Sequence, residues 1–147
     1  VNHPIQGMVG DLCIDSVARI WYALKERGLR SVIFNTVHDS TIVDLYLPEI
    51  LEVMPLIRAE MFTKLPDYFP WINVPFAIDQ ELGLSWGASV KSSLDGNLLT
   101  MKGNPSIIHS CLLRLRNCFR IDVVSADAKP EKDGSSSLTF KARLVAC

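Results

Sequence analysis

Apolar and polar positions between Ser31 and Leu47 follow the pattern of two β-strands. Two runs rich in β-branched and aromatic residues, Ser31–Val37 and Thr41–Leu47, lie on either side of the polar triplet His38-Asp39-Ser40. Such runs suit a pleated, half-buried surface, and a short polar break between them is typical of a hairpin turn. The pattern therefore predicts a tight antiparallel hairpin with Asp39 at its tip.

Helical spacing precedes and follows this hairpin. Apolar residues three and four positions apart predict one helix over about Pro4–Arg27, ending at Gly28, and a second over about Pro48–Lys64. Two helices on one face of an antiparallel sheet make an α+β layer. The apolar sets are Val9, Cys13, Val17, Ile20 and Leu24 in the first helix, and Ile50, Leu51, Met54, Ile57, Met61 and Leu65 in the second.

A third strand is expected at Val74–Glu81, beside the hairpin. The loop before it, Leu65–Ile72, carries Tyr68, Phe69 and Trp71. Aromatic residues in a loop can stack on nucleic-acid bases. Packing onto the edge of the sheet is the simpler expectation for these three side chains.

The remainder of the chain predicts a separate small domain. Gly, Ser and Asp between 87 and 96 indicate a linker at 89–96, so the expected organisation is a first domain at 1–88 and an appendage at 97–147. Within the appendage the pattern predicts a β-α-β-β unit of unknown role. Its elements are a strand at Asn97–Lys102, a helix from Asn104-Pro105 to Asn117, and strands at Phe119–Ala126 and Leu138–Val145.

Composition is that of an ordinary globular protein, with 48% hydrophobic and 21% charged residues. No apolar run approaches the ~20 residues that span a bilayer, and no signal peptide begins the chain, so no membrane association is expected. The four cysteines have no metal-binding or disulfide spacing, and Cys13 falls on an apolar helix face, so free thiols in a cytoplasmic protein are expected. The first residue is Val, which suggests a piece of a longer chain.

Charge is divided unevenly along the chain. Residues 1–88 carry six Lys and Arg against eleven Asp and Glu, whereas residues 89–147 carry nine against five. An acidic part that binds metal beside a basic part suits a phosphate-backbone partner. A modest imbalance of this kind also arises on any solvated surface.

Asp39 is the first candidate for chemistry. A carboxylate held at the tip of a hairpin is well placed to bind a hard cation such as Mg²⁺, which prefers oxygen ligands. Aspartate is also a common turn residue without any further role. The hairpin alone leaves both interpretations open.

Three motifs in order change that balance. The chain reads N-x-P-I-Q-G-x-x-x-D from Asn2, V-H-D from Val37 and V-P-x-x-x-D from Val74, followed by Ser85-Trp86. In this order and spacing, residues 1–88 closely resemble the C-terminal part of the palm of family A DNA polymerases, the bacterial repair polymerase and its phage relatives. The resemblance implies a DNA-directed DNA polymerase, in a bacterium or a phage-infected cell.

The resemblance also implies roles for individual residues. Asp39 matches a metal-binding aspartate of the two-metal site, and His38 matches a residue that contacts the primer terminus. Asn2 and Gln6 match positions that hydrogen-bond primer–template DNA. Helix capping for Asn2 and Gln6, and a structural hydrogen bond for His38, remain alternatives. Ser40 departs from the family, whose hairpin usually carries Glu there.

The resemblance implies an incomplete catalytic site. Its cofactor is Mg²⁺ and its substrates are primer–template DNA and dNTP, but the family's second metal-binding aspartate and its phosphate-binding Lys and Arg lie in motifs that precede this segment. The remainder of the polymerase, as an upstream segment or a separate chain, is therefore an expected partner. Two alternatives remain: a nucleic-acid-binding or assembly module without turnover, and an unrelated Mg²⁺ hydrolase that uses Asp39.

Overall fold

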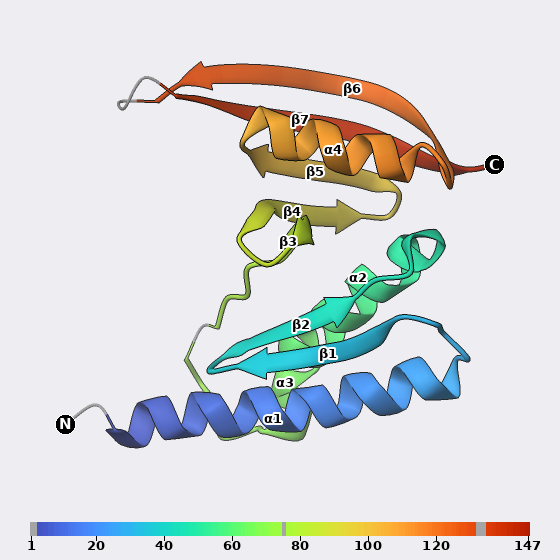
Figure 1. Ribbon diagram of the computed structural model, residues 1–147. Helices are drawn as coiled ribbons and strands as arrows, with labels where there is room; N and C mark the ends of the chain where they lie inside the picture. Colours follow the sequence, from blue (N-terminus) through green and yellow to red (C-terminus); the bar gives the residue numbers. More distant parts are fainter. Residues whose placement is uncertain (1–2, 75, 132–134) are drawn as a thin grey trace. The chain divides into compact units, whose positions relative to one another are not determined.

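The computed structural model describes residues 3–74, 76–131 and 135–147, and of residues 3–5 only the backbone. The chain divides into two compact units, Val1–Ile78 and Asp79–Cys147. Each unit combines helix with antiparallel sheet, which confirms the α+β class (Figure 1). In the described residues, no helix is both long and apolar enough to cross a membrane.

The first unit is built on one long helix and one hairpin. The helix and hairpin predicted from the sequence are confirmed, with β2 ending three residues earlier than expected. A cluster of buried apolar residues joins them to the next helix, because Ile20 and Leu24 of the long helix pack with Val53 and Leu56. The elements are α1 (His3–Glu26), β1 (Val32–Val37), β2 (Ser40–Asp44), the 3₁₀ turn η1 (Leu47–Glu49) and α2 (Ile50–Arg58).

The long helix begins close to the predicted position and ends as Gly28 adopts a φ of 65°. Positive φ suits glycine after a helix C-terminus. Cys13 is buried, as the apolar stripe predicts, and its Sγ lies 3.6 Å from Oγ1 of Thr41 on β2. On the hairpin, Ile33 and Val43 pack against the buried cluster, so both helices cover the same face.

The second predicted helix is present but irregular. Pro55 lies inside α2, where it lacks the N–H that an interior residue donates. The helix continues as a π-helical segment, η2 (Ala59–Thr63), in which Lys64 N–H donates to Ala59 O. The next residues form a short helical turn, α3 (Leu65–Tyr68), where a loop was expected.

The predicted third strand beside the hairpin is wrong. Residues 76–80 form no strand, and the sheet that contains the hairpin consists of β1 and β2 alone within the described part of the chain. The next strand, β3 (Glu81–Ser85), pairs with β4 (Ala88–Asp95) in the second unit. The expected linker at 89–96 therefore belongs to a strand as far as Asp95. Along the chain the first unit ends at Ile78 and the second begins at Asp79, rather than near residue 88.

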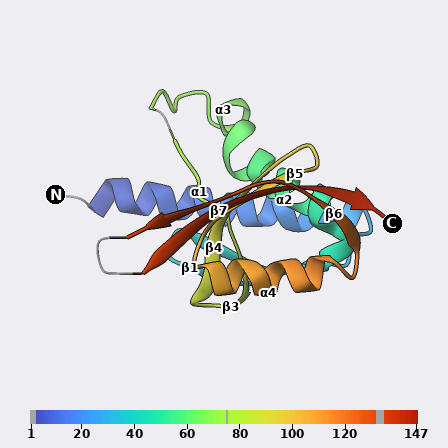
Figure 2. The same ribbon diagram turned by 90° about the horizontal axis from the view of Figure 1, so that it is seen from above.

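The second unit is a five-stranded antiparallel sheet with order β3-β4-β5-β7-β6. The predicted β-α-β-β succession is confirmed, although it is preceded by two further strands. One helix lies on one face of this sheet, as Figures 1 and 2 show. The remaining elements are β5 (Leu98–Gly103), α4 (Pro105–Leu115), β6 (Phe119–Pro130) and β7 (Ser136–Ala146).

Candidate catalytic hairpin and nucleic-acid interface

The hairpin turn consists of His38 and Asp39, because Val37 pairs directly with Ser40. Ser40 therefore belongs to the strand and not to the turn. His38 has a φ of 54°, which is uncommon outside glycine. The favoured two-residue hairpin loops have positive φ at their first central residue, because their twist then matches that of the strands. A histidine in this conformation stores about 1–2 kcal/mol of backbone strain.

Asp39 is exposed at the tip and engages no described residue in a hydrogen bond or ion pair. Its carboxylate oxygens are thus free for a ligand, which fits one coordination position of a hard cation. In the ranges 3–74, 76–131 and 135–147, no group of three or more His, Cys, Asp and Glu side chains could hold a metal ion. Asp39 and its described neighbours therefore cannot form a closed metal site by themselves.

The base of the hairpin is fixed by Glu49. Its carboxylate accepts hydrogen bonds from Arg30 N at 2.8 Å, from Ser31 N at 2.9 Å and from Ser31 Oγ at 2.8 Å. Ser31 Oγ in turn accepts from Tyr46 N at 3.0 Å. The residues before β1 and after β2 are therefore linked to Glu49, Ser31 directly and Tyr46 through Ser31. Desolvation raises the pKa of Glu49, but the hydrogen bonds from Arg30 and Ser31 outweigh it and the pKa is lowered overall.

The start of α1 lies toward the same end of the unit as the hairpin tip (Figure 1). The contact between Cys13 and Thr41 sets this arrangement, because Thr41 is one residue beyond the end pair of the hairpin. Gln6 is exposed about two helical turns before Cys13. No hydrogen bond joins Gln6 to His38 or Asp39 among the described residues. Asn2, the other predicted DNA contact, lies outside the described residues.

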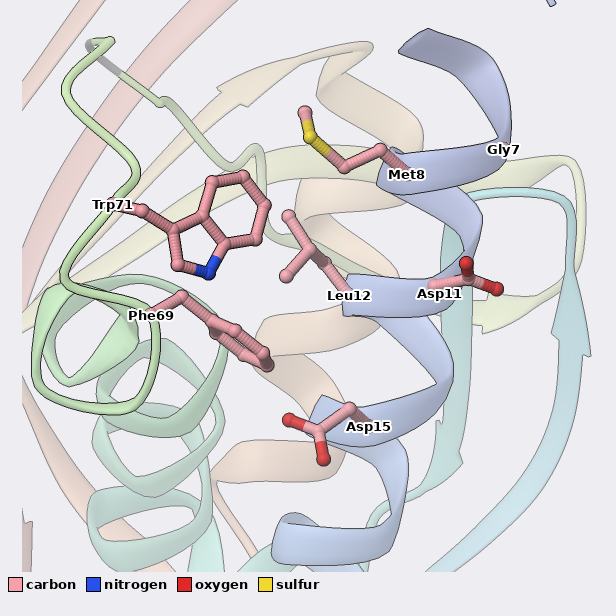
Figure 3. Close-up of a pocket in the computed structure, with 7 residues that line it drawn as sticks. All are labelled: Gly7, Met8, Asp11, Leu12, Asp15, Phe69 and Trp71. Carbon is pink, nitrogen blue, oxygen red and sulfur yellow. The ribbon is translucent and has the colours of Figure 1, made fainter. Parts of the chain in front are cut away.

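The aromatic side chains of residues 68–71 lie against α1 and not on the edge of the sheet, which corrects the sequence expectation. Phe69 and Trp71 stack edge to face at 6.1 Å, and the guanidinium of Arg19 lies 4.2 Å from the ring centroid of Tyr68. Phe69 and Trp71 line an open cavity of about 600 Å³ (Figure 3). The other lining residues are Gly7, Met8, Asp11, Leu12 and Asp15.

Two acids of α1 that line the cavity, Asp11 and Asp15, make it a poor site for phosphate.

A cluster of charged side chains lies beside the cavity. Asp15 forms an ion pair with Arg19, which also donates to Glu60 O at 3.0 Å. Glu60 is 5% exposed and its carboxylate lies 2.5 Å from Lys64 Nζ. This cluster holds the aromatic segment on α1. No sequence pattern indicates this cluster, because Arg19 and Glu60 are 41 residues apart.

The chain is similar to DNA polymerases over about three-fifths of its length. It is 33% identical to the DNA polymerase of Bacillus phage SP01 over 98 residues, which are 65% of this chain and 11% of that protein. It is 31% identical to DNA polymerase I of Chloroflexus aurantiacus and 29% identical to DNA polymerase I of Lactococcus lactis. Each of these two matches covers 86 residues, 58% of this chain and 9% of the relative.

The chain thus spans about a tenth of the length of the curated relatives it matches. No protein-family model matches the chain, and no solved structure matches it significantly.

Proposed function

We propose that the chain is the C-terminal palm segment of a family A DNA polymerase and that Asp39 is one ligand of its two-metal site. The exposed, unpartnered carboxylate at the tip of a rigid hairpin carries this proposal, together with the similarity to DNA polymerases. Two divalent cations about 3.5–4 Å apart, when bound, activate the attacking oxygen and stabilise the leaving oxygen of a displacement. The chain's own part is to hold one carboxylate oxygen still.

His38 would position the primer end beside that carboxylate. The strained φ of 54° supports a functional role, because backbone strain concentrates at binding and catalytic sites. His38 and Asp39 are adjacent, exposed residues of the same two-residue turn. A primer terminus held by His38 would then lie close to the metal that Asp39 binds.

Glycines on the first turns of α1 support a nucleic-acid contact there. A Cβ added at Gly7 or Gly10 would meet no atom within 4 Å, so internal packing in the described structure does not require glycine. Glycine inside a helix costs about 0.5–1 kcal/mol relative to alanine. Close approach of a DNA minor groove, with Gln6 and Asn2 as hydrogen-bonding side chains, would account for tolerating that cost.

The remaining ligands and the dNTP-binding residues would come from elsewhere in the polymerase. Within the described residues Asp39 has no second carboxylate that completes a metal site. We therefore expect the isolated chain to add no nucleotides. A chimera tests the proposal in an active context: the matching segment of the phage SP01 polymerase is replaced by this chain and primer extension is measured with Mg²⁺.

The decisive variant of that chimera is Asp39→Asn, with Asp44→Asn as its matched control. Asp44 is an exposed aspartate on the same hairpin, at the far end of β2. We expect Asp39→Asn to abolish extension while primer–template affinity is retained, and Asp44→Asn to extend normally. Full extension by the Asp39→Asn chimera would remove Asp39 from the mechanism. If the chimera binds DNA but never extends, that result contradicts the catalytic role of this segment.

A second candidate is a nucleic-acid-binding or assembly module that retains the palm fold without turnover. Ser40 favours it, because the strand position after Asp39 lacks the carboxylate that the family usually carries. The same chimera discriminates the two functions. A module without turnover would bind primer–template but leave the chimera inactive, whether residue 39 is Asp or Asn.

A further inference from the structure

The second unit has one open sheet face. The helix α4 covers the other face, where Leu99 and Met101 of β5 and Phe140, Ala142 and Leu144 of β7 are buried. Because successive side chains of a strand point to opposite faces, the residues between them face away from α4. Those residues on the two central strands are Leu98, Thr100 and Lys102 of β5 and Thr139, Lys141 and Arg143 of β7.

On β5 and β7 this face carries three cations, Lys102, Lys141 and Arg143, and we call them the cationic strip. All three are exposed, and none is joined to a described residue by a hydrogen bond or ion pair. No Asp or Glu occurs in either strand. Lys102 pairs with Thr139, four residues before Arg143, so the strip extends about 14 Å along the strands.

On the neighbouring strands, most cations of this face are paired with acids, and exposed Lys129 of β6, opposite Ser137, is the exception in the described part of the chain. On β4, Lys91 forms an ion pair with Asp79 at 2.7 Å. On β6, Arg120 lies 3.2 Å from Asp122, which is opposite Arg143 in the pairing. Two further acids flank the strip, Asp95 of β4 opposite Leu98 and Asp127 of β6 opposite Thr139. An anionic ligand would therefore follow β5 and β7 rather than spread across the sheet.

We propose that the cationic strip binds the sugar–phosphate backbone of duplex DNA without reading its sequence. One strand of B-DNA carries a phosphate every 3.4 Å along the axis, so about four phosphates match the length of the strip. The hydroxyls of Thr100 and Thr139, on the same face, can donate to phosphate oxygens. β5 and β7 place no aromatic residue on this face for stacking on bases, which favours backbone contacts.

The choice of DNA rests on the proposed polymerase function, and the surface itself is independent of Asp39. It would add sequence-independent affinity for the duplex to that of the proposed catalytic segment. Each phosphate contact by Lys or Arg contributes about 0.9 to the slope of log affinity against log salt concentration. The strip should therefore be visible as salt dependence.

Salt titration of the full chain with a fluorescently labelled DNA duplex tests the proposal. The double variant Lys102→Gln/Lys141→Gln should flatten the slope by about 1.8, which makes the loss of affinity between 50 and 200 mM salt about 12-fold smaller. The matched control is Arg114→Gln/Arg116→Gln, which removes the same charge from exposed positions in and just after α4. The control should leave the slope within about 0.3 of the unmodified chain.

A gain of binding provides a second test that does not depend on the double variant folding. Asp127→Asn removes an acid opposite Thr139 and should raise affinity at low salt, with two unrelated duplex sequences affected equally. Equal slopes for the two double variants, or an unchanged affinity for Asp127→Asn, would overturn the proposal. The chimera result with Asp39→Asn concerns extension and not the salt slope, so either proposal can fail while the other stands.

Discussion

Glu49 should contribute strongly to the stability of the first unit. Glu49→Ala removes the acceptor for Arg30 and for both donors of Ser31, a residue that is 2% exposed. A hydrogen bond to a charged group contributes about 1.5–3 kcal/mol, and leaving out the exposed Arg30 bond gives a loss of about 3 kcal/mol. Glu49→Gln keeps one acceptor oxygen, so its free energy of unfolding should fall by about half as much as that of Glu49→Ala.

Urea unfolding followed by tryptophan fluorescence measures this loss. Trp86 is changed to Phe so that Trp21 and Trp71, both in the first unit, carry the signal. Glu52→Ala is the matched control, because Glu52 lies three residues later, in the first turn of α2. Its exposed ion pair with Arg27 contributes about 0–1 kcal/mol. Equal losses for Glu49→Ala and Glu52→Ala would refute the reasoning.

The pH dependence of the same measurement follows from the lowered pKa of Glu49. A carboxyl whose folded pKa lies below its ordinary value of 4.5 stabilises the fold above that value. The contribution is then lost as the pH falls through the folded pKa. The difference in unfolding free energy between the unmodified chain and Glu49→Gln should therefore narrow below pH 4.5. A difference that widens with acid would contradict the assigned hydrogen bonds.

Three further predictions concern single residues. His38→Gly should raise the free energy of unfolding by about 1 kcal/mol, since glycine adopts φ of 54° without strain, and thermal unfolding measures it. Gly83→Ala should destabilise the second unit by about 1–3 kcal/mol, because the added Cβ would lie 2.7 Å from Ser89 Cα. Gly10→Ala, where the added Cβ meets no atom within 4 Å, should instead stabilise α1 by up to about 1 kcal/mol. Urea unfolding measures both changes. A thiol reagent should label exposed Cys147 first and Cys111 last, because burial raises the pKa of the Cys111 thiol. Mass spectrometry of timed samples gives the order of labelling, and a different order would contradict the prediction.

Local pattern was enough to predict most of the first unit. Helical spacing located α1, and the β-branched runs located the hairpin with Asp39 at its turn, because both signals lie within a few neighbouring residues. The partner of a strand is a non-local property, which is why Val74–Glu81 was wrongly placed beside the hairpin. The bonds of Glu49 to Ser31 span 18 residues, and no periodicity reveals them.

The candidate site was predicted to a smaller extent. Asp39 and His38 do occupy the turn, and Gln6 is exposed, but their roles in metal and DNA binding stay predictions. The cations of β5 and β7 could not be recognised as one surface from the sequence, because Lys102 and Lys141 are brought together only by strand pairing. The charge count shows that residues 89–147 carry net positive charge, but it does not show on which face of the sheet the cations lie.

The two-stranded sheet of the first unit has a practical consequence. Neither β1 nor β2 pairs with a third described strand, so each has an outer row of N–H and C=O groups available to bond with another extended chain. Phe34, 73% exposed at the irregularity in β1, adds an apolar side chain to one of these rows. Concentrated preparations would therefore be prone to self-association through these borders, and charged substitutions there offer a direct way to keep the protein in solution.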